Sequence, residues 1–320
     1  MRRALIPAGH SCRDQGSCNK ELRWEVGQFK MKSSIKKGWS FLFLLPAAIL
    51  VLLAELIPVI YTTYLGFMEW NLIQPPKWAG LANYLKVFST PELLNALKNT
   101  AYWVFGTIVF AVGFPLLIAA LLTRVKGKVI FKTIFFIPST LSPTIAAIFW
   151  RRVLSSQQGA LYPILEAIGL TAQPLLTIPQ INTFVMIGIW TWQYFGLNLI
   201  LFLVGLETIP KEPVEAAMID GAGPVQIFYR IILPLLQPIM LLVMANAVIN
   251  SIRMFDIPWI VIQGGPGRVS ETLAISLYRE SFLLFRMGLG SAIAVVLSII
   301  TLLASYRYLA AMGGGKKKER

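Results

Sequence analysis

The sequence predicts an all-α integral membrane protein with six transmembrane helices. Of its 320 residues, 56% are hydrophobic and only 14% are charged, a balance that is typical of membrane domains. The hydrophobic residues fall in separate runs of about 20 residues, the length of helix that crosses the hydrocarbon core of a bilayer. These runs predict spans at about 40–65, 99–123, 130–150, 182–205, 235–262 and 288–310.

Basic residues predict the side of the membrane on which each connection lies. Of the 29 Lys and Arg residues, twenty lie in the two terminal segments and in the connections around 124–132 and 206–234. Eight lie in the connections 66–98, 151–181 and 263–287. Because cytoplasmic loops carry the excess of Lys and Arg, both termini and 206–234 are expected to be cytoplasmic.

The net charge of +14 points to a partner at the membrane surface. The basic residues lie beside the apolar runs and form no single basic face, so the expected partner is anionic membrane lipid and not nucleic acid. Residues 1–38 are expected to form a cytoplasmic N-terminal tail that is disordered over 1–30, and 311–320 a basic cytoplasmic tail. Met31 opens a short basic lead into the first apolar run and is a candidate start of the natural chain, with an ordinary longer tail as the alternative.

One cytoplasmic connection, 206–234, is long enough to contain two short helices. Pro213 suits the first turn of a helix, and the acidic residues beside it suit the positive end of the helix dipole, which predicts a helix over about 211–220. Gly221 then permits a turn that other residues resist, and Pro224 can open a second helix. The segment is therefore predicted to be a helix-turn-helix elbow, with an amphipathic helix on the membrane surface as the alternative.

Three groups of residues in this elbow carry a family resemblance. Glu215-Ala216-Ala217, Asp220-Gly221 and Ile231-x-Leu233-Pro234 together resemble the EAA signature of ABC-importer permease subunits. In that family the elbow is the coupling helix, which docks in a cleft of the ATP-binding subunit. The resemblance implies a coupling role for Glu215, Ala216, Ala217, Asp220, Gly221, Gly223, Ile231, Leu233 and Pro234.

Further landmarks resemble the carbohydrate branch of that family, which includes permeases for maltose, lactose and glycerol-3-phosphate. They are Gly80-Leu-Ala-Asn-Tyr84, Phe131-Lys-Thr-Ile-Phe-Phe-Ile-Pro138, Gly264-Gly-Pro-Gly267 and Glu271-Thr-Leu273. The resemblance implies the type I ABC-importer permease fold. A first helix and external loop would occupy 39–98, and a permease core of five helices would occupy 99–310.

The same resemblance implies a function and a set of partners. The chain would be a permease subunit of a binding-protein-dependent importer in a prokaryotic cell membrane, and it would move a sugar, a polyol or a glycerol phosphate inward. The implied partners are a second homologous permease subunit, an ATP-binding-cassette ATPase dimer and an extracytoplasmic sugar-binding protein. ATP hydrolysis would reside in the ATPase, so this chain is expected to be neither an enzyme nor a cofactor protein.

Polar and aromatic side chains in the fourth and fifth predicted spans are the candidates for a substrate path. Polar groups are costly at membrane depth and usually face a cavity or a partner helix, while aromatic planes and amides suit a sugar. The candidates are Trp192, Tyr194, Asn198, Asn246, Asn250, Arg253 and Asp256. Alternatively, the aromatic rings anchor the helices at the membrane interface, the asparagines join helices, and Arg253 and Asp256 neutralise each other. Glu55 in the first span is expected to be structural or interfacial.

Other classes of function fit the sequence less well. A membrane enzyme would need clustered histidines, paired intramembrane acids or a nucleophile with its base, and the sequence has no such group. The sequence around Gly127-Lys128 also lacks the Ser or Thr of a phosphate-binding loop. No metal site is expected, because Cys12, Cys18 and His10 in the tail are too few for zinc. An ABC permease for a non-sugar solute and, less favoured, an ion-coupled secondary transporter stay open as alternatives.

Overall fold

The structure is a computed structural model that describes residues 36–123, 125, 127–155, 159–169, 174–179 and 181–314. The expectations for the tail over 1–30, for Met31 and for the last six residues lie outside these ranges. The chain divides into two units, Met1–Tyr61 and Thr62–Arg320, and each is described by itself.

The first unit contains one apolar helix, whose last turn continues into the second unit. Its parts are α2 (Lys36–Val51), the wide π turn η1 (Leu52–Leu56) and α3 (Ile57–Gly66). The span Leu44–Gly66 has a mean hydropathy of 2.3, and its apolar side chains are mostly exposed before the buried Leu65, which suits contact with lipid or with a partner helix. Glu55 lies in the π turn and is exposed.

The second unit contains the remaining described elements. They are β1 (Met68–Glu69), β2 (Lys77–Trp78), α4 (Ala82–Ser89), α5 (Pro91–Gly106), η2 (Thr107–Gly113), α6 (Phe114–Leu122), α7 (Lys128–Phe136), η3 (Ile137–Thr140), α8 (Pro143–Val153), α9 (Leu161–Ala167), α10 (Asn182–Glu207), α11 (Glu212–Ile219), α12 (Pro224–Ile227), η4 (Phe228–Ile232), α13 (Leu233–Leu235), α14 (Gln237–Ile252), α15 (Asp256–Ile262), η5 (Pro266–Arg268), α16 (Leu273–Tyr278), η6 (Arg279–Leu283) and α17 (Met287–Gly314). The two strands form an antiparallel hairpin in which Met68 lies opposite Trp78.

Four helices in the described part of the chain are long and apolar enough to cross a membrane, and there are six spans if each of two bent helix pairs counts as one. The four are Leu44–Gly66, Pro91–Leu122, Asn182–Glu207 and Met287–Tyr308. The bent pairs are Val129–Thr140 with Pro143–Val153, at 96°, and Pro224–Leu235 with Gln237–Ile252, at 73°.

Two expected spans therefore differ from the straight helices that run length predicts. The expected span 130–150 bends sharply where Ser142 caps the N-terminus of α8 with its side chain, directly before Pro143. The expected span 235–262 ends at Ile252, and α15 begins separately at Asp256. Residues 253–255 between them are not helical.

Three of the described π turns share one cause. The turns η1, η2 and η4 each end two residues before a proline, namely Pro58, Pro115 and Pro234. Proline has no N–H and its ring crowds the carbonyl four residues earlier, so the preceding turn widens. At Pro115 this widening leaves the span Pro91–Leu122 long enough to cross the membrane.

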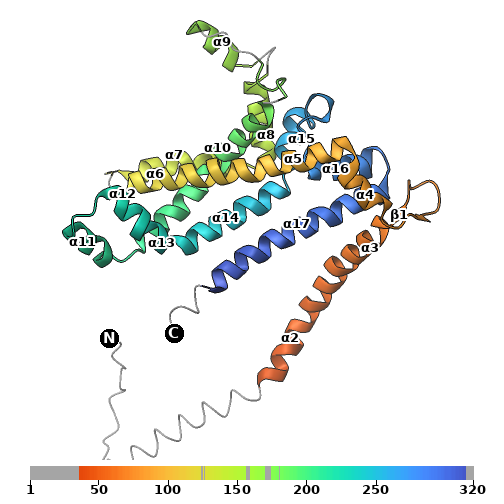
Figure 1. Cartoon of the computed structure of the whole chain (residues 1–320), viewed down its shortest axis with the longest axis horizontal. Coiled ribbons are helices and arrows are strands. Elements are labelled where there is room, and N and C mark those ends of the chain that lie inside the picture. The colour runs from red at the N-terminus through yellow and green to blue at the C-terminus, as the bar shows by residue number, and fades with distance from the viewer. Residues whose placement is uncertain are drawn as a thin grey trace, which may run out of the picture. The chain divides into compact units, whose positions relative to one another are not determined.

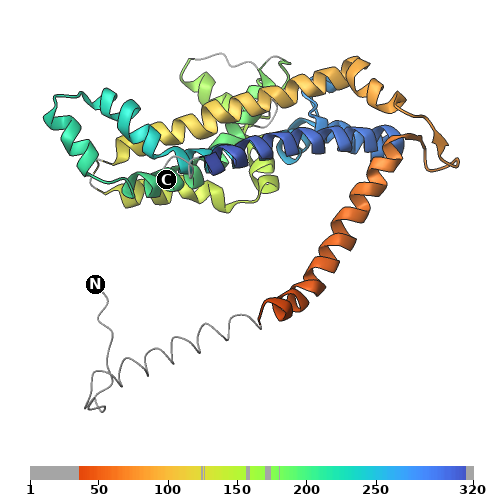
Figure 2. The ribbon, with the colours of Figure 1, turned by 60° about the horizontal axis from the view of Figure 1, so that its bottom comes forward.

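Helix α10 lies at the centre of the second unit and packs against α5, α6, α7, α8, α14 and α15. Its side chains Met186, Ile187, Leu199 and Phe202 are fully buried in the main core. A smaller core cluster forms where α17 packs against α4 and α16. Figures 1 and 2 show this arrangement from two directions.

The bend between α7 and α8 is attached to α10 by hydrogen bonds. The Ser139 hydroxyl donates to the carbonyl of Gln193 at 2.6 Å, and the Gln193 amide donates to the carbonyl of Leu141 at 2.8 Å. A Cβ atom at Gly196 would lie 2.0 Å from the carbonyl oxygen of Phe135, so only glycine permits this approach. Both the backbone carbonyl and the side-chain amide of Gln193 therefore stabilise the bend.

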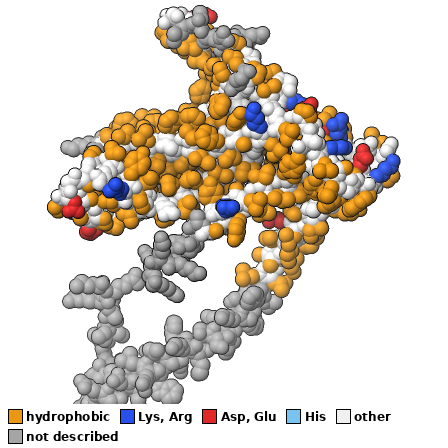
Figure 3. Space-filling view, viewed as in Figure 1, with side chains coloured by type: hydrophobic (Ala, Val, Ile, Leu, Met, Phe, Trp, Pro, Cys, Tyr) orange, Lys and Arg blue, Asp and Glu red, His pale blue; other side chains and the backbone are white. Residues whose placement is uncertain are grey.

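The two ends of the second unit differ from its flank in the kind of side chain that they expose (Figure 3). Figures 1 and 2 place α11 and α12 at one end of the long helices and the hairpin with α4 at the other. In Figure 3, hydrophobic side chains cover most of the visible flank of the helices, and acidic and basic side chains lie near the hairpin and also at the end that contains α11 and α12. This distribution suits a body that is surrounded by lipid along its flank and by water at its ends.

Candidate functional site

The elbow is formed by α11, a glycine turn and α12. Helix α11 ends in a six-residue hydrogen-bonded loop: the Ala222 N–H donates to the Ala217 carbonyl at 2.9 Å, and the Gly221 N–H donates to the Met218 carbonyl at 3.1 Å. Gly221 has a φ of +79°, in the left-handed region that closes such helix ends. The sequence expectation of a turn that needs glycine at 221 agrees with this geometry.

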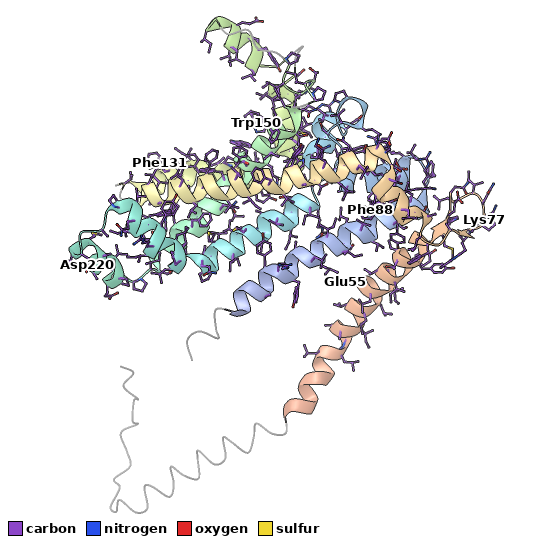
Figure 4. All side chains as sticks on the ribbon, viewed as in Figure 1. Glu55, Lys77, Phe88, Phe131, Trp150 and Asp220 are labelled. Carbon is purple, nitrogen blue, oxygen red and sulfur yellow. The ribbon has the colours of Figure 1, made fainter. Side chains whose placement is uncertain are left out.

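The elbow has an exposed surface of apolar and acidic side chains. None of the α11 side chains is buried, and Ile219 is 87% exposed. Met218 and Val225 are also exposed, and Glu215 lies on the same short helix. Figure 4 labels Asp220 at the tip of the elbow, far from Lys77 on the hairpin. An exposed apolar surface of this kind is typical of a site that contacts another protein or a membrane.

The elbow connects directly to the membrane helices. Leu236, between α13 and α14, is 1% exposed and packs against Gly205 near the end of α10. A Cβ atom added to Gly205 would lie 2.7 Å from Leu236 Cδ1. At the same end of α10, Glu207 Oε1 lies 3.6 Å from Lys132 Nζ of α7. The last motif residues Ile231, Leu233 and Pro234 lie in η4 and α13, just before the 73° bend. A displacement of the elbow would therefore act on both α10 and α14.

The path candidates on α14 and after it are accessible. Asn246 is exposed, Asn250 is half-buried, and the Asn250 amide donates to Asn246 Oδ1 at 2.6 Å. Arg253 is the residue at which α14 ends, and Asp256 begins α15; both are exposed. Among the described residues no ion pair joins these two, which differs from the expected neutralisation. Arg253 also lies beyond the last helical residue, so its side chain does not continue the helical face of the two asparagines.

The candidates on α10 lie in helix contacts. Asn198 is 3% exposed, and its amide donates to the Ala111 carbonyl in η2 at 2.6 Å. The Trp192 ring stacks on Phe149 at 6.2 Å between centroids, and the Tyr194 ring stacks on Trp190 at 4.5 Å. The Asn198 geometry agrees with the helix-joining alternative, and the Trp192 ring reaches α8, whereas the Tyr194 ring stacks on a residue of its own helix. Among the path candidates, Asn246, Arg253 and Asp256 are exposed, and Asn250, Trp192 and Tyr194 are half-buried.

Sequence reasoning missed an ion network near the hairpin end. Glu271 is fully buried and is bonded by Arg268 and by Arg279 Nε, the latter at 3.0 Å. Glu280 is 3% exposed and lies 3.3 Å from Arg268 and 3.4 Å from Arg286. Burial acts to lower the pKa of Arg268, but hydrogen bonds and charge from Glu271 and Glu280 raise it overall, so this arginine stays charged.

The sequence does carry a signal for this network. Basic and acidic residues alternate between 268 and 286. This connection contributes its landmarks to the family resemblance, but its charges play no part in that resemblance. Asn99 of α5 fixes the network further, because its amide donates to the carbonyl of Glu271 at 3.0 Å. Spacing alone does not predict which of these charges become buried.

Comparisons with known proteins agree with this architecture. Residues 109–312 match the family described as "Binding-protein-dependent transport system inner membrane component", and the chain belongs to this family. It is 32% identical over 284 residues to the probable ABC transporter permease protein YurN of Bacillus subtilis, covering 87% of this chain and 97% of that protein. It is 33% identical over 285 residues to the arabinooligosaccharides transport system permease protein AraP of the same species, covering 88% and 90%.

Two further similarities concern substrate class and fold. The sn-glycerol-3-phosphate transport system permease protein UgpA of Agrobacterium fabrum is 33% identical over 227 residues, covering 70% of this chain and 77% of that protein. A crystal structure of a bacterial ABC transporter involved in the import of the acidic polysaccharide alginate superposes with a TM-score of 0.71 at 24% identity, covering 88% and 99%.

The resemblance found in the sequence is thus confirmed at the level of the family. The chain is a membrane-spanning permease subunit of a binding-protein-dependent transport system. Its relatives include a permease named for arabinooligosaccharides and one named for glycerol-3-phosphate, in line with the carbohydrate landmarks. The likeness to the alginate transporter shows a shared permease fold.

Proposed function

We propose that this permease subunit imports a sugar, using ATP hydrolysis by a partner subunit. The observation that carries the proposal is the similarity over most of the chain to permeases named for arabinooligosaccharides and for glycerol phosphate. Its assembly would contain a second homologous permease subunit, an ATP-binding-cassette ATPase dimer and an extracytoplasmic sugar-binding protein. ATP would be bound and hydrolysed by the ATPase dimer, whose closure this chain would convert into movement of its helices.

The elbow is the proposed coupling element. Its exposed α11 surface would dock on the ATPase, and the contact of Leu236 with Gly205 would transmit movement to α10. The small side chains Ala216 and Ala217 suit a close approach between two proteins. The glycine turn at Gly221 sets the direction of α12 relative to α11.

The proposed orientation has the elbow in the cytoplasm and the hairpin outside. The excess of basic residues in the terminal segments and around 124–132 supports this orientation. The positions of the elbow and the hairpin at opposite ends of the long helices also support it. Both termini would then be cytoplasmic, with six spans when each bent pair counts as one.

The proposed substrate path runs along α14 to the break at residues 253–255. Asn246 and Asn250 would be costly if they faced lipid, and the second permease subunit would enclose them in a polar channel. The exposed charges of Arg253 and Asp256 would lie at the end of this channel, where they can bond sugar hydroxyl groups. Loss of one neutral hydrogen bond to the sugar weakens binding by about 0.5–1.5 kcal/mol, or roughly 2- to 12-fold.

Reconstituted vesicles provide the test. The complete importer is assembled with its binding protein, and uptake of radiolabelled sugars is compared with uptake of amino acids and of metal ions. We expect ATP-dependent uptake of a sugar, reduced about 2- to 12-fold by Asn250→Ala with ATPase docking unchanged. The control Leu302→Ala alters an exposed apolar side chain of α17 and should leave uptake unchanged. Uptake of an amino acid or a metal ion without uptake of any sugar would refute the proposal.

A further inference from the structure

The described part of the second unit contains a cavity of about 640 Å³ near the hairpin, a volume within the range of small-molecule sites. Its walls come from the hairpin connection, α4, the start of α5 and the segment before α17. Lys77, labelled in Figure 4, is one of the residues that line it. This cavity is separate from the path candidates on α14, none of which lines it.

The charges in this cavity nearly balance. Four cationic and three carboxylate side chains line it: Lys77, Lys86, Arg268, Arg286, Glu69, Glu92 and Glu280. A cavity for an inorganic anion or cation would carry an excess of one sign. Charges of both signs instead supply hydrogen-bond donors and acceptors side by side, which is what a neutral ligand with many hydroxyl groups requires.

Part of the cavity wall is held in place before any ligand arrives. Glu280 is 3% exposed and bonds Arg268 and Arg286 at once, so the positions of both guanidinium groups are restricted. The Arg286 side chain is 63% exposed and forms an ion pair with Glu280 through one nitrogen, whereas a guanidinium group carries five N–H donors. Most of these donors are therefore left for water or for a ligand.

An aromatic ring and amides complete the chemistry. Trp70 is half-buried and lines the cavity with Asn71, Gln74 and Asn83. An indole ring packs against the apolar face of a sugar ring, while the Gln74 amide and the carboxylates can bond its hydroxyl groups. The Asn83 amide nitrogen and the Asn71 amide oxygen already bond backbone atoms and help to shape the wall. We propose that this cavity is a saccharide-binding site on the permease itself, outside the substrate path. The ligand class and the external position rest on the proposed function.

The cavity wall also connects to the region of the substrate path. Arg268 bonds Glu271, Glu271 bonds Arg279, and the Arg279 guanidinium lies 5.8 Å from the centre of the Trp259 ring. Trp259 stacks on Phe255 at the break after α14. A continuous set of contacts thus joins the outer cavity to the break beside Arg253.

Binding to the purified complete importer, without ATP and without the binding protein, tests the proposal. The probes are maltotriose and arabinotriose as neutral saccharides and tri-galacturonate as a charged one, measured by saturation-transfer NMR and by titration calorimetry. We expect a neutral saccharide to bind with a Kd near 1 mM, and Trp70→Ala and Glu92→Gln each to weaken it about tenfold or more. The matched control is Ile73→Ala in the same hairpin, because Ile73 is 89% exposed and does not line the cavity.

Three outcomes would overturn the proposal. Saccharide binding that Trp70→Ala leaves intact and Asn250→Ala abolishes would assign the ligand to the substrate path. Loss of binding-protein docking in Trp70→Ala, with no saccharide binding in the parent importer, would make the cavity a protein contact. Tighter binding of tri-galacturonate than of both neutral probes would contradict the balanced-charge argument. Sugar uptake by the parent importer in the vesicle assay stays intact in each case if the proposed function holds, so the two failures are distinguishable.

Discussion

Replacing Gly221 by valine tests the elbow at its most constrained residue. Gly221 has a φ of +79°, and a Cβ atom at this position would meet no atom within 4 Å. The effect of a side chain therefore comes from the backbone and not from crowding with neighbours. The left-handed region costs an L-residue about 1–2 kcal/mol, and a β-branched side chain is especially disfavoured there. Such a penalty shifts the equilibrium between the formed and the opened turn by roughly 5- to 30-fold.

We expect Gly221→Val to impair ATP-driven transport without loss of the membrane body. The elbow lies at the end of the long helices and contributes no buried side chain from α11, so assembly in the membrane should persist. Sugar-stimulated ATP hydrolysis and sugar uptake should both fall by about the same 5- to 30-fold factor. Both are measured in reconstituted vesicles, with the affinity of the external binding protein for sugar measured separately and expected to stay constant.

A second glycine in the same elbow supplies the matched control. A Cβ atom at Gly223 would also meet no atom within 4 Å, but the φ of Gly223 is −71°, which any L-residue adopts. Gly223→Ala should therefore reduce uptake and hydrolysis less than Gly221→Val does, because alanine adds no backbone strain at 223. Gly221→Asn should recover part of the activity that valine removes, because asparagine tolerates the left-handed region. Normal uptake and normal stimulated hydrolysis in Gly221→Val would refute a coupling role for this turn.

Three further predictions address packing, the ion network and orientation. Gly196→Val should lower the free energy of unfolding by about 1–3 kcal/mol or more, since its Cβ atom would lie 2.0 Å from a backbone oxygen. In the control Gly188→Ala on the same helix, the added Cβ atom meets no atom within 4 Å, so the melting temperature should not change. Glu271→Gln should lower stability by up to about 3–5 kcal/mol, because two arginines lose their buried partner; an unchanged melting temperature would contradict this. A single cysteine at Ile73 should react with an impermeant reagent in intact cells and one at Gln226 should not, and the reverse labelling would overturn the orientation.

The sequence predicted where the apolar helices lie but not where they bend. Run length locates a span because about 20 apolar residues match the bilayer, whatever they pack against. The effect of a proline on a helix depends on the residues that pack around it. Pro115 is accommodated by one wide turn in a continuous span, whereas the chain around Pro138 and Pro143 bends by 96°. The bend depends on Ser139 and Gln193, which meet only in the folded protein.

The elbow was more predictable than the substrate path, for a physical reason. Its turn depends on local backbone conformation, and a glycine next to a helix end is a direct sign of a left-handed residue. A polar residue in a span carries no such local sign, because its partner comes from another helix. Burial of Glu271 likewise depends on Arg268 and Arg279 and on the approach of Asn99 from α5.

Asn198 and Asn250 illustrate this difference and lead to the last prediction. Pro115 has no N–H to offer the carbonyl of Ala111, four residues before it, and the Asn198 amide donates to that carbonyl at 2.6 Å. Asn198→Ala would remove the partner of a buried carbonyl and should lower the free energy of unfolding by about 1–3 kcal/mol, with uptake per folded importer retained. Asn250→Ala should do the opposite, because the hydrogen bonds that the half-buried Asn250 amide donates stay within its own helix. Melting temperature and uptake are measured on both variants. Equal losses of stability would contradict the proline explanation, and loss of uptake by Asn198→Ala alone would assign Asn198 to the path.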